Sequence, residues 1–298
     1  MRQPRVVVVG SANMDLVATA EALPRPGETR LGTDFVMVPG GKGANQAIAA
    51  TRAGADCAFL GAIGSDSFGV TLKARITAAG VDTGPLRVTY GPSGVALVMV
   101  NAAGENAILV TPGANASLTD LTEAELDLVR GADVLVAQLE IPVETVTQAA
   151  VAAREAGRRV VLNAAPALPM PPELLAAVDL LVVNENEAQA YTGRGREDPH
   201  ALLDLVPRAV LTLGAAGAWY GDREGTAVHL PAVPVAAVDS TAAGDAFTGA
   251  LAVAWGEGRD LVDAVRWAVA AGAACVRRLG ASVSLPHRAE IDELYPAP

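Results

Sequence analysis

Apolar residues fall into short runs separated by polar and glycine-rich segments, and this pattern predicts strands and helices that alternate along the chain. Runs such as 5–10, 134–137 and 160–163 are rich in valine and leucine, which is typical of strands buried on both faces. Longer segments such as 68–79, which ends at Gly80, indicate helices between them. Because strands that alternate with helices build parallel sheets covered on both faces, we expect an α/β fold with a mostly parallel central sheet.

The rest of the chain continues this alternation. Further strands are expected at 56–64, 180–183, 209–213 and 233–238, and peripheral antiparallel strands at 219–220 and 226–230. Helices are expected at 44–53, 118–130, 143–156, 172–177, 185–191, 201–205, 243–255, 261–277 and 289–295. All of these elements belong to one predicted domain, 1–298, in which we find no internal repeat.

Two segments depart from the alternation. Residues 16–38 are interrupted by Pro24, Pro26 and Gly27, so they do not read as a helix. A stretch of this length is long for a loop of a compact domain, and two strand-like pieces are expected in it. Residues 94–111 read as a hairpin around a short turn. We therefore expect a small β excursion built from both segments.

The junction 238–249 leads from a β-like run into a helix and contains the first candidate for chemistry. Small residues at Ala242, Ala243 and Gly244 allow the backbone to turn sharply and to approach a ligand closely. A helix that begins there points free N–H groups forward, which favours phosphate, and Asp245 lies in its first turn. In phosphoryl transfer such a carboxylate accepts the hydroxyl proton while the N–H groups hold the developing charge. Taken alone, the junction also fits an ordinary helix start with an acid that the dipole stabilises.

A second glycine-rich stretch begins at Gly40 and runs through Gly41, Lys42 and Asn45. Its glycines permit close approach of the backbone to a ligand, and a helix follows. It is not a Walker A loop, because glycine follows the lysine and the preceding spacing differs. Lys42 and Asn45 could reach a polyhydroxy ligand from the helix start. A strand-to-helix turn with a solvated lysine is the alternative.

Polar residues recur immediately after the predicted strands, where open α/β sheets bind their ligands. They are Asn13, Asp15, Gln138, Glu140, Asn163, Asn184, Glu187 and the segment 214–217. A cluster of carboxylates and amides at one sheet edge is a site hypothesis. Since the chain lacks a G-x-G-x-x-G pattern, a dinucleotide Rossmann site is disfavoured.

Composition and charge narrow the classes of partner. The 298 residues are 51% hydrophobic and carry a net charge of −11, which argues against nucleic acid or an anionic membrane as partner. Cys57 and Cys275 both lie in apolar runs and read as buried free thiols of a reducing compartment. No apolar stretch reaches 18 residues, and the N-terminal run is too short for a signal peptide, so a cytoplasmic protein is expected.

The two glycine-rich motifs, in this order and about 200 residues apart, resemble the signatures of the ribokinase, or PfkB, family of ATP-dependent sugar kinases. Asn184 and Glu187 match the family's N-x-x-E element, and the resemblance extends over essentially the whole chain. It is strongest to the ribose-specific members, in Gly10 to Asp15, Gly113 to Asn115 and Gln138 to Glu140. The implied fold is a ribokinase-like three-layer α/β/α sandwich with a small β-sheet lid from about 16–38 and 94–111.

The resemblance also implies roles for individual residues. Asp245 would be the catalytic base, and the amides of Ala242, Ala243 and Gly244 would form the anion hole. The sugar would be held by Asn13, Asp15, Gly41, Lys42, Asn45 and Glu140, with Asp245 beside it. The nucleotide ATP would be bound by Asn184, Thr212, Leu213, Gly214, Ala215, Ala216 and Gly217, together with Gly244 and Asp245.

Two metal ions are implied in the same way. Mg²⁺ would be organised by Asn184 and Glu187 through water and would bridge the ATP phosphates. A monovalent cation, typically K⁺, would sit beside the anion hole and fix the loop that presents the amides. Its ligands would be Asp239, Thr241, Cys275, Arg278, Gly280 and Ser284, mostly through backbone carbonyls and, at Ser284, through the hydroxyl.

The implied activity is phosphorylation of D-ribose at O5 to give ribose 5-phosphate and ADP. Alternatives are another substrate of the same family, such as 2-deoxyribose, another sugar or a nucleoside, and a non-catalytic sugar-binding regulator. A lid sheet with one apolar face is hard to leave in water, and the family's lids pair, so a homodimer through the lid is expected.

Overall fold

The computed structural model describes residues 2–295, in which one large sheet organises the fold. Its strands are β1 (Arg5–Val9), β4 (Asp56–Leu60), β9 (Val134–Gln138), β10 (Arg159–Asn163), β11 (Leu180–Asn184), β12 (Arg208–Thr212), β13 (Ala218–Asp222) and β14 (Ala227–Leu230). Their order is β14-β13-β12-β11-β10-β9-β1-β4. The six strands from β4 to β12 are parallel, whereas β13 and β14 are antiparallel at one edge.

Strand β1 shows why the sheet is covered on both sides. Its four valines are buried, and successive side chains point to opposite faces of a strand. Val6 and Val8 therefore join one hydrophobic core, and Val7 and Val9 join the other. A strand in the middle of a two-faced sheet needs such an unbroken apolar run.

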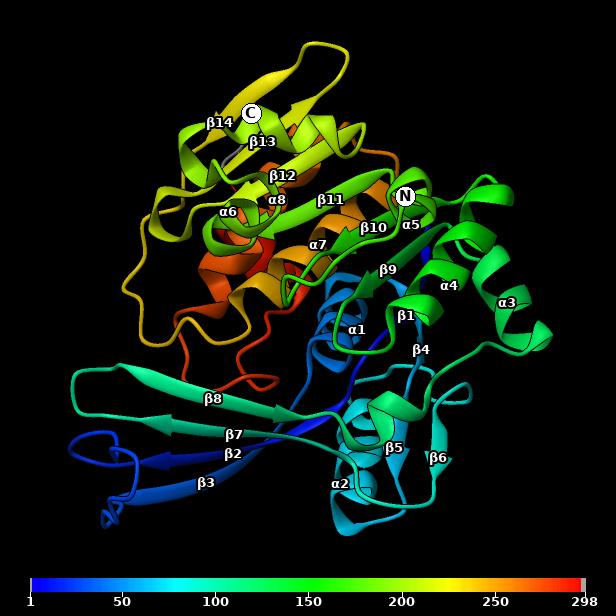
Figure 1. Ribbon diagram of the computed structural model, residues 1–298. Coiled ribbons are helices and arrows are strands. Elements are labelled where there is room, and N and C mark those ends of the chain that lie inside the picture. Colours follow the sequence, from blue (N-terminus) through cyan, green and yellow to red (C-terminus); the bar gives the residue numbers. More distant parts are fainter. Residues whose placement is uncertain (1, 296–298) are drawn as a thin grey trace.

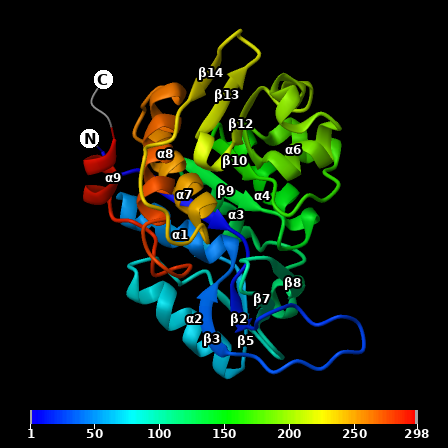
Figure 2. The ribbon, with the colours of Figure 1, turned by 90° about the vertical axis from the view of Figure 1, so that its left-hand side faces the viewer.

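Helices form the two outer layers. The first face carries α1 (Lys42–Ala53), α2 (Ser67–Ala78), α7 (Ala243–Gly256), α8 (Leu261–Cys275) and α9 (Arg288–Leu294). The second face carries α3 (Glu123–Arg130), α4 (Val143–Glu155), α5 (Pro172–Ala177) and α6 (Glu185–Thr192). Figure 2 shows α7 and α8 on one side of the sheet and α4 and α6 on the other. Of the helices among residues 2–295, none is both long and apolar enough to cross a membrane.

A separate four-stranded sheet projects from this body, at the lower left in Figure 1. Its strands are β2 (Asn13–Thr19), β3 (Asp34–Gly40), β7 (Gly94–Val100) and β8 (Asn106–Thr111), in the order β3-β2-β7-β8. We call it the lid sheet. β5 (Ala62–Gly64) and β6 (Arg87–Thr89) form a small two-stranded sheet at its base.

The structure corrects several expected elements. The expected strand 56–64 is two strands, which separate at Gly61. The helix expected at 118–130 begins only at Glu123, because a capping box at Thr122 starts it there. The helix expected at 201–205 is the 3₁₀ turn η3 (Pro199–Asp204). The run 233–238 has no regular secondary structure, consistent with prolines that cannot donate to a strand ladder.

Candidate active site

The carboxyl ends of the parallel strands bring together residues from distant parts of the chain. Ser11 follows β1, and its hydroxyl donates to Glu140 Oε2 at 2.5 Å, just beyond β9. The amide nitrogen of Lys42 donates to the same oxygen at 3.1 Å, and Asn13 Nδ2 lies 3.5 Å from it. Glu140 thus connects the start of α1 to Asn13, the first residue of β2, as expected for polar groups at this edge of the sheet.

Asn13 is fixed by a residue outside both glycine-rich motifs. Asn115 Oδ1 accepts from the amide of Ala12 at 3.0 Å, and Asn115 Nδ2 donates to Asn13 Oδ1 at 2.7 Å. Gly94 leaves room for this pair, since a Cβ there would lie 2.2 Å from both side chains. These contacts anchor the lid sheet to the main body directly beside the predicted sugar site.

The turn into α1 requires glycine for two reasons. Gly41 has φ of 90°, a conformation that residues with a Cβ avoid, and a Cβ there would lie 2.6 Å from the amide nitrogen of Asn13. A Cβ at Gly43 would lie 2.5 Å from the amide nitrogen of Ser11. The helix can therefore begin directly against the backbone that follows β1, which places Lys42 and Asn45 at the sheet edge.

Asp15 lies on the lid sheet and faces this edge. Burial raises the pKa of its carboxyl to about 7, and the charges of Glu140 and Asp245 reinforce the shift while Lys42 opposes it. Burial tends to lower the pKa of Lys42, but the carboxylates of Asp245, Glu140, Glu187 and Asp15 outweigh it, so the pKa of Lys42 is raised. Lys42 is thus an ammonium ion held among carboxylates.

Asp245 lies at the opposite wall, in the first turn of α7, and is buried. Its two oxygens accept from two neighbouring side chains of α1, with Asn45 Nδ2 at 3.0 Å and Gln46 Nε2 at 2.9 Å. Burial raises the pKa of Asp245, whereas Lys42 and the two amide donors act in the opposite direction and Glu140 adds to the rise. The carboxylate does not cap its own helix and is therefore free to face the site.

The turn before α7 has the backbone expected of an anion hole. Ala242 has φ of 61°, the one left-handed non-glycine residue among those the structure describes, and such strain is concentrated at functional sites. A Cβ at Gly244 would meet nothing within 4 Å, so the space in front of it is open. Of the three predicted amides, that of Ala243 donates to the carbonyl of Ser240 at 3.2 Å.

A cavity of about 230 Å³ opens in front of this turn. It is lined by Lys42, Asn163, Ala165, Val182, Asn184, Glu187, Thr212, Ser240, Ala242, Gly244, Asp245 and Thr248. The carboxylate of Asp245 and the helix start at Gly244 therefore open into the same space as the ends of β10, β11 and β12.

Asn184 and Glu187 form the capping box of α6. Asn184 Oδ1 accepts from the amide of Glu187 at 2.9 Å, and Glu187 Oε2 accepts from the amide of Asn184 at 2.8 Å. Burial raises the pKa of Glu187, although the Asn184 amide and the charge of Lys42 oppose the shift. The box uses one oxygen of each side chain. The other Glu187 oxygen and the side-chain nitrogen of Asn184 remain for a ligand.

The segment after β12 reaches the surface. Thr212 lines the cavity, whereas Leu213 packs against the core of the second face; Gly214 and Ala215 are exposed, and Ala216 is partly buried. Gly217 has φ of 95°, and a Cβ there would lie 2.1 Å from the carbonyl oxygen of Leu230. Thr212 and the backbone beyond Gly214 are thus placed to meet a ligand, while the Leu213 side chain is not.

The predicted cation loop is closed by Asp239. Its oxygens accept from the amide of Thr241 at 2.9 Å and from the amide of Gly280 at 2.9 Å. Ser284 Oγ lies 3.2 Å from Cys275 Sγ, and the carbonyl of Ser284 accepts from Arg278 at 3.0 Å. All six predicted ligands therefore lie in two segments that meet behind the anion hole. Within residues 2–295, no group of three or more His, Cys, Asp or Glu could hold a metal ion on its own.

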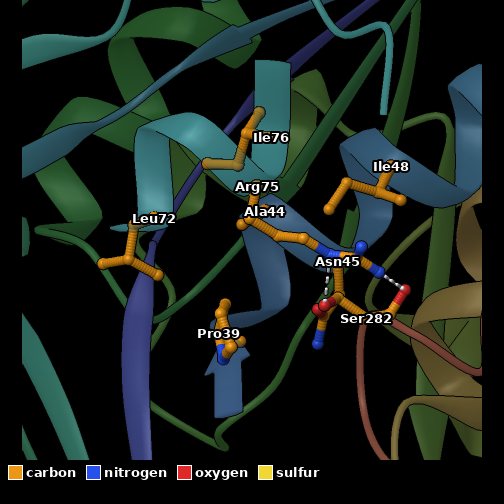
Figure 3. A pocket seen from close by; sticks show the side chains of 9 residues that line it. Pro39, Ala44, Asn45, Ile48, Leu72, Arg75, Ile76 and Ser282 are labelled. Atoms are coloured by element: carbon orange, nitrogen blue, oxygen red, sulfur yellow. Dashed lines mark hydrogen bonds between the residues drawn. The ribbon is translucent and has the colours of Figure 1, made fainter. Parts of the chain in front are cut away.

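A second, narrower pocket lies between this loop and α2. Figure 3 shows Asn45 and Ser282 lining it together with Leu72 and Ile76. Arg75 donates to Ser282 Oγ at 3.0 Å and to its carbonyl at 2.8 Å. The pocket is too narrow to hold a water molecule, so the larger cavity is the one suited to a ligand.

The sequence analysis gave roles to Asp245 and Asn45 and placed Gln138 and Asn163 at the candidate sheet edge, but it gave no role to Gln46, the second partner of the carboxylate. Gln46, Gln138 and the partly buried Asn163 form a chain of hydrogen-bonded amides behind Asp245. The signal that could have found Gln46 was its position directly after Asn45 in the glycine-rich motif.

Comparison with known proteins places this geometry in context. The model of the pfkB family carbohydrate kinases matches residues 3–288. The chain is 37% identical to the ribokinase of Haemophilus influenzae, covering 96% of each chain, and 38% identical to that of Bacillus subtilis, covering 97% of this chain and 98% of the other. The structure of Arabidopsis thaliana ribokinase complexed with ribose and ATP matches with a TM-score of 0.93 at 33% identity over 100% of both chains. The predicted α/β fold, with a mostly parallel sheet and a small separate sheet, is confirmed.

Proposed function

The chain belongs to the pfkB family of carbohydrate kinases, and from that premise we propose that it transfers the γ-phosphoryl group of ATP to O5 of D-ribose. The observation that carries this proposal is the buried carboxylate of Asp245, held by two amide donors, at the mouth of a cavity that a helix start also faces. Relatives that match over nearly their full length are ribokinases, which supports ribose as the sugar.

The sugar site lies between the lid sheet and the start of α1. The carboxylates of Asp15 and Glu140 accept hydrogen bonds from the sugar hydroxyls there. The side-chain amides of Asn13 and Asn45 are further hydrogen-bonding groups for the sugar. Such a site discriminates strongly against a sugar that lacks a hydroxyl, because a buried polar group is then left without a partner. This argument favours ribose over 2-deoxyribose.

Asp245 acts as the base toward O5. Because the pKa of this buried carboxylate is raised, it is a better proton acceptor than an exposed aspartate. In a loose transition state the proton leaves late, and positioning contributes most of the catalysis. The amides of Ala242 to Gly244 receive the charge that develops on the transferred group. The Ala243 amide would exchange its internal acceptor, the Ser240 carbonyl, for phosphate oxygen.

The capping box of α6 fits a magnesium site in which the protein binds the ion through water, as outer-sphere ligands. Asn184 Oδ1 and Glu187 Oε2 are used within the box. The second Glu187 oxygen can therefore hold a metal-bound water, and the side-chain Nδ2 of Asn184 can donate to phosphate. When bound, Mg²⁺ supplies charge neutralisation at the ATP phosphates. Glu187 would position the ion through its bound water. The Lys42 ammonium and the amides at the start of α7 would bind the remaining phosphate oxygens.

The loop closed by Asp239 fits a monovalent cation. Its available ligands are backbone carbonyls, a carboxylate and the Ser284 hydroxyl, which suit a hard cation without strong geometric demands. When bound, K⁺ supplies a positive charge behind the anion hole. Asp239 holds both segments of the loop together through Thr241 and Gly280.

The lid sheet supports a homodimer. Cross-strand register places Met37, Leu97 and Leu109 in one row on the face opposite Asp15, and Phe35 and Met99 in the next. All five are exposed, with Leu109 at 63% and Met37 at 57%. A contiguous apolar face of this kind is typical of a surface that a second subunit covers.

The test is release of ADP from purified protein with Mg-ATP on ribose, 2-deoxyribose, fructose and adenosine, each in potassium and in tetramethylammonium buffer. We expect turnover on ribose that depends on potassium and is lost in a folded Asp245→Asn variant. Turnover on another substrate alone would overturn the ribose assignment. Sugar binding without turnover on any of them would indicate a non-catalytic protein.

A further inference from the structure

A row of three side-chain amides stands behind the carboxylate of Asp245; Gln46 and Gln138 are buried, and Asn163 is partly buried. Gln46 is fully buried, and its Nε2 donates to Asp245 Oδ1 at 2.9 Å and to Asn163 Oδ1 at 3.0 Å. Gln46 Oε1 accepts from Gln138 Nε2 at 2.6 Å. Asn163 Nδ2 in turn donates to the carbonyl of Val182 at 3.1 Å. The row runs from the sheet, through α1, to the carboxylate on α7.

The hydrogen bonds leave the Gln46 amide only one orientation. Both of its N–H groups and its oxygen have partners, so a flipped amide would point its oxygen at Asp245 and Asn163. The flip would also turn its NH₂ group toward the NH₂ group of Gln138. Since the three partners agree, Gln46 always presents a donor to the carboxylate.

Gln138 reaches this position because Gly10 lacks a side chain. A Cβ at Gly10 would lie 1.9 Å from Gln138 Oε1. That oxygen is buried and has no hydrogen-bond partner among the described residues. An unpartnered buried oxygen costs stability, and such groups persist where they have another role. Here the cost accompanies a donor directed at Gln46.

We propose that Gln46 is a positioning residue for the phosphoryl transfer, and that Gln138 sets its orientation, so that the Asp245 carboxylate cannot rotate away from the sugar hydroxyl. The proposal rests on the proposed function, in which Asp245 is the base. Asn45 holds one carboxylate oxygen and Gln46 the other. With both oxygens anchored, the remaining lone pairs of Asp245 keep a fixed direction.

The same donors favour the ionised form of the base. The charged groups that face Asp245 are Lys42 on α1, Glu140 beyond β9 and Asp15 on the lid sheet. Lys42 favours ionisation, whereas Glu140 and Asp15 oppose it, and burial opposes it most. Loss of the Gln46 donor therefore raises the pKa of the base, and the acidic limb of the pH profile of kcat moves to higher pH.

Two isosteric variants test the proposal, Gln46→Met and Gln138→Met, with Gln148→Met as the matched control. Gln148 is a partly buried glutamine whose side chain accepts one backbone hydrogen bond, from Leu121 at 2.8 Å, and it lies on α4, away from the site. Each protein is assayed for kcat and KM over a range of pH, and its fold is checked by thermal unfolding.

For Gln46→Met we expect kcat to fall about 10- to 100-fold, as for one lost hydrogen bond to a charged group, while KM for ribose stays within about threefold. The acidic limb of kcat should move up by about one pH unit. Gln138→Met, which keeps the Gln46 contact but frees its orientation, should show the same two changes to a smaller extent. If Gln46→Met does not fold, the Gln138 variant decides the matter alone.

The proposal is overturned if the variants lower kcat no more than Gln148→Met does, or if the acidic limb does not move. An effect confined to KM or to the unfolding temperature, as a structural amide would give, also overturns it. Absence of ribose phosphorylation by the unaltered protein would instead refute the proposed function. The pKa of Asp245, followed by carbon-13 NMR of the carboxyl group, distinguishes the two failures, because it should rise in Gln46→Met whether or not ribose is the substrate.

Discussion

Helix α7 packs tightly against α1 at Gly249, so Gly249→Ala perturbs the frame of the candidate site without touching a group proposed to react. A Cβ there would lie 2.6 Å from Ala49 Cβ, 2.8 Å from Ala50 N and 2.9 Å from Gln46 O. Carbon atoms in ordinary contact are about 3.5–4.0 Å apart, so the two helices must separate by roughly 1 Å at this point. Two of the three atoms are backbone and cannot rotate aside.

The change has two opposing energetic effects. Overpacking a tight core costs about 1–3 kcal/mol, and replacement of glycine by alanine in a helix returns about 1 kcal/mol. Because backbone atoms take the clash, we expect the upper end of that range and a net loss of about 2 kcal/mol. A shift of about 1 Å would also stretch the Asn45 and Gln46 hydrogen bonds to Asp245, so kcat should fall about 100-fold.

The measurement combines urea unfolding with steady-state kinetics, and Gly272→Ala is the matched control. The nearest atom to a Cβ at Gly272 is the carbonyl oxygen of Ala243 at 3.6 Å, an ordinary contact. This variant should therefore show only the helix-propensity gain of about 1 kcal/mol. If Gly249→Ala is as stable as its control and keeps full kcat, the close approach of the two helices does not position the catalytic carboxylate.

Two further predictions concern the lid sheet. Burial raises the pKa of Asp15 to about 7, from 3.8, so the folded protein binds an extra proton between these values and its free energy of unfolding falls as pH rises through that range. Asp15→Asn should therefore raise the unfolding temperature at pH 8. In the unaltered protein, KM for ribose should rise below pH 7 as the Asp15 carboxylate protonates. A KM that is independent of pH from 5 to 8 would contradict this reasoning. Leu109→Asp, on the face opposite Asp15, should give monomers in light scattering, whereas Ile108→Asp on the Asp15 face should remain dimeric; the reverse outcome would show that the other face pairs.

The parts of the fold that follow from local pattern were predicted well. Strand β1 and helix α4 were predicted almost to the residue, because an apolar run and a long helical segment are properties of neighbouring residues. Of the lid strands, β7 and β8 were predicted almost to the residue, whereas β2 begins earlier than expected, at Asn13, where it pairs with Gly40 and Gly94. Partners that lie far apart along the chain are invisible to a local pattern.

The candidate site shows the same division. Asp245 and Asn45 could be identified because each belongs to a short motif with its own backbone requirement. The bond from Gln46 to Asp245 joins residues 199 positions apart, so the local pattern that places Gln46 after Asn45 does not show which group its side chain meets. The left-handed conformation of Ala242 was equally hidden, because alanine is not a residue that favours it.

The contact between α1 and α7 explains why small residues, glycine and alanine, occupy this part of the core. The proposed mechanism needs the first turns of α1 and α7 together, since one carries Lys42 and Asn45 and the other carries Asp245. Two helices can start side by side only if the surfaces between them are thin, and Gly249 against Ala49 meets that condition. Larger side chains would add apolar burial but would separate the two helix starts. The small residues along this contact therefore let the two helix starts meet, and core-filling substitutions there are expected to lower kcat.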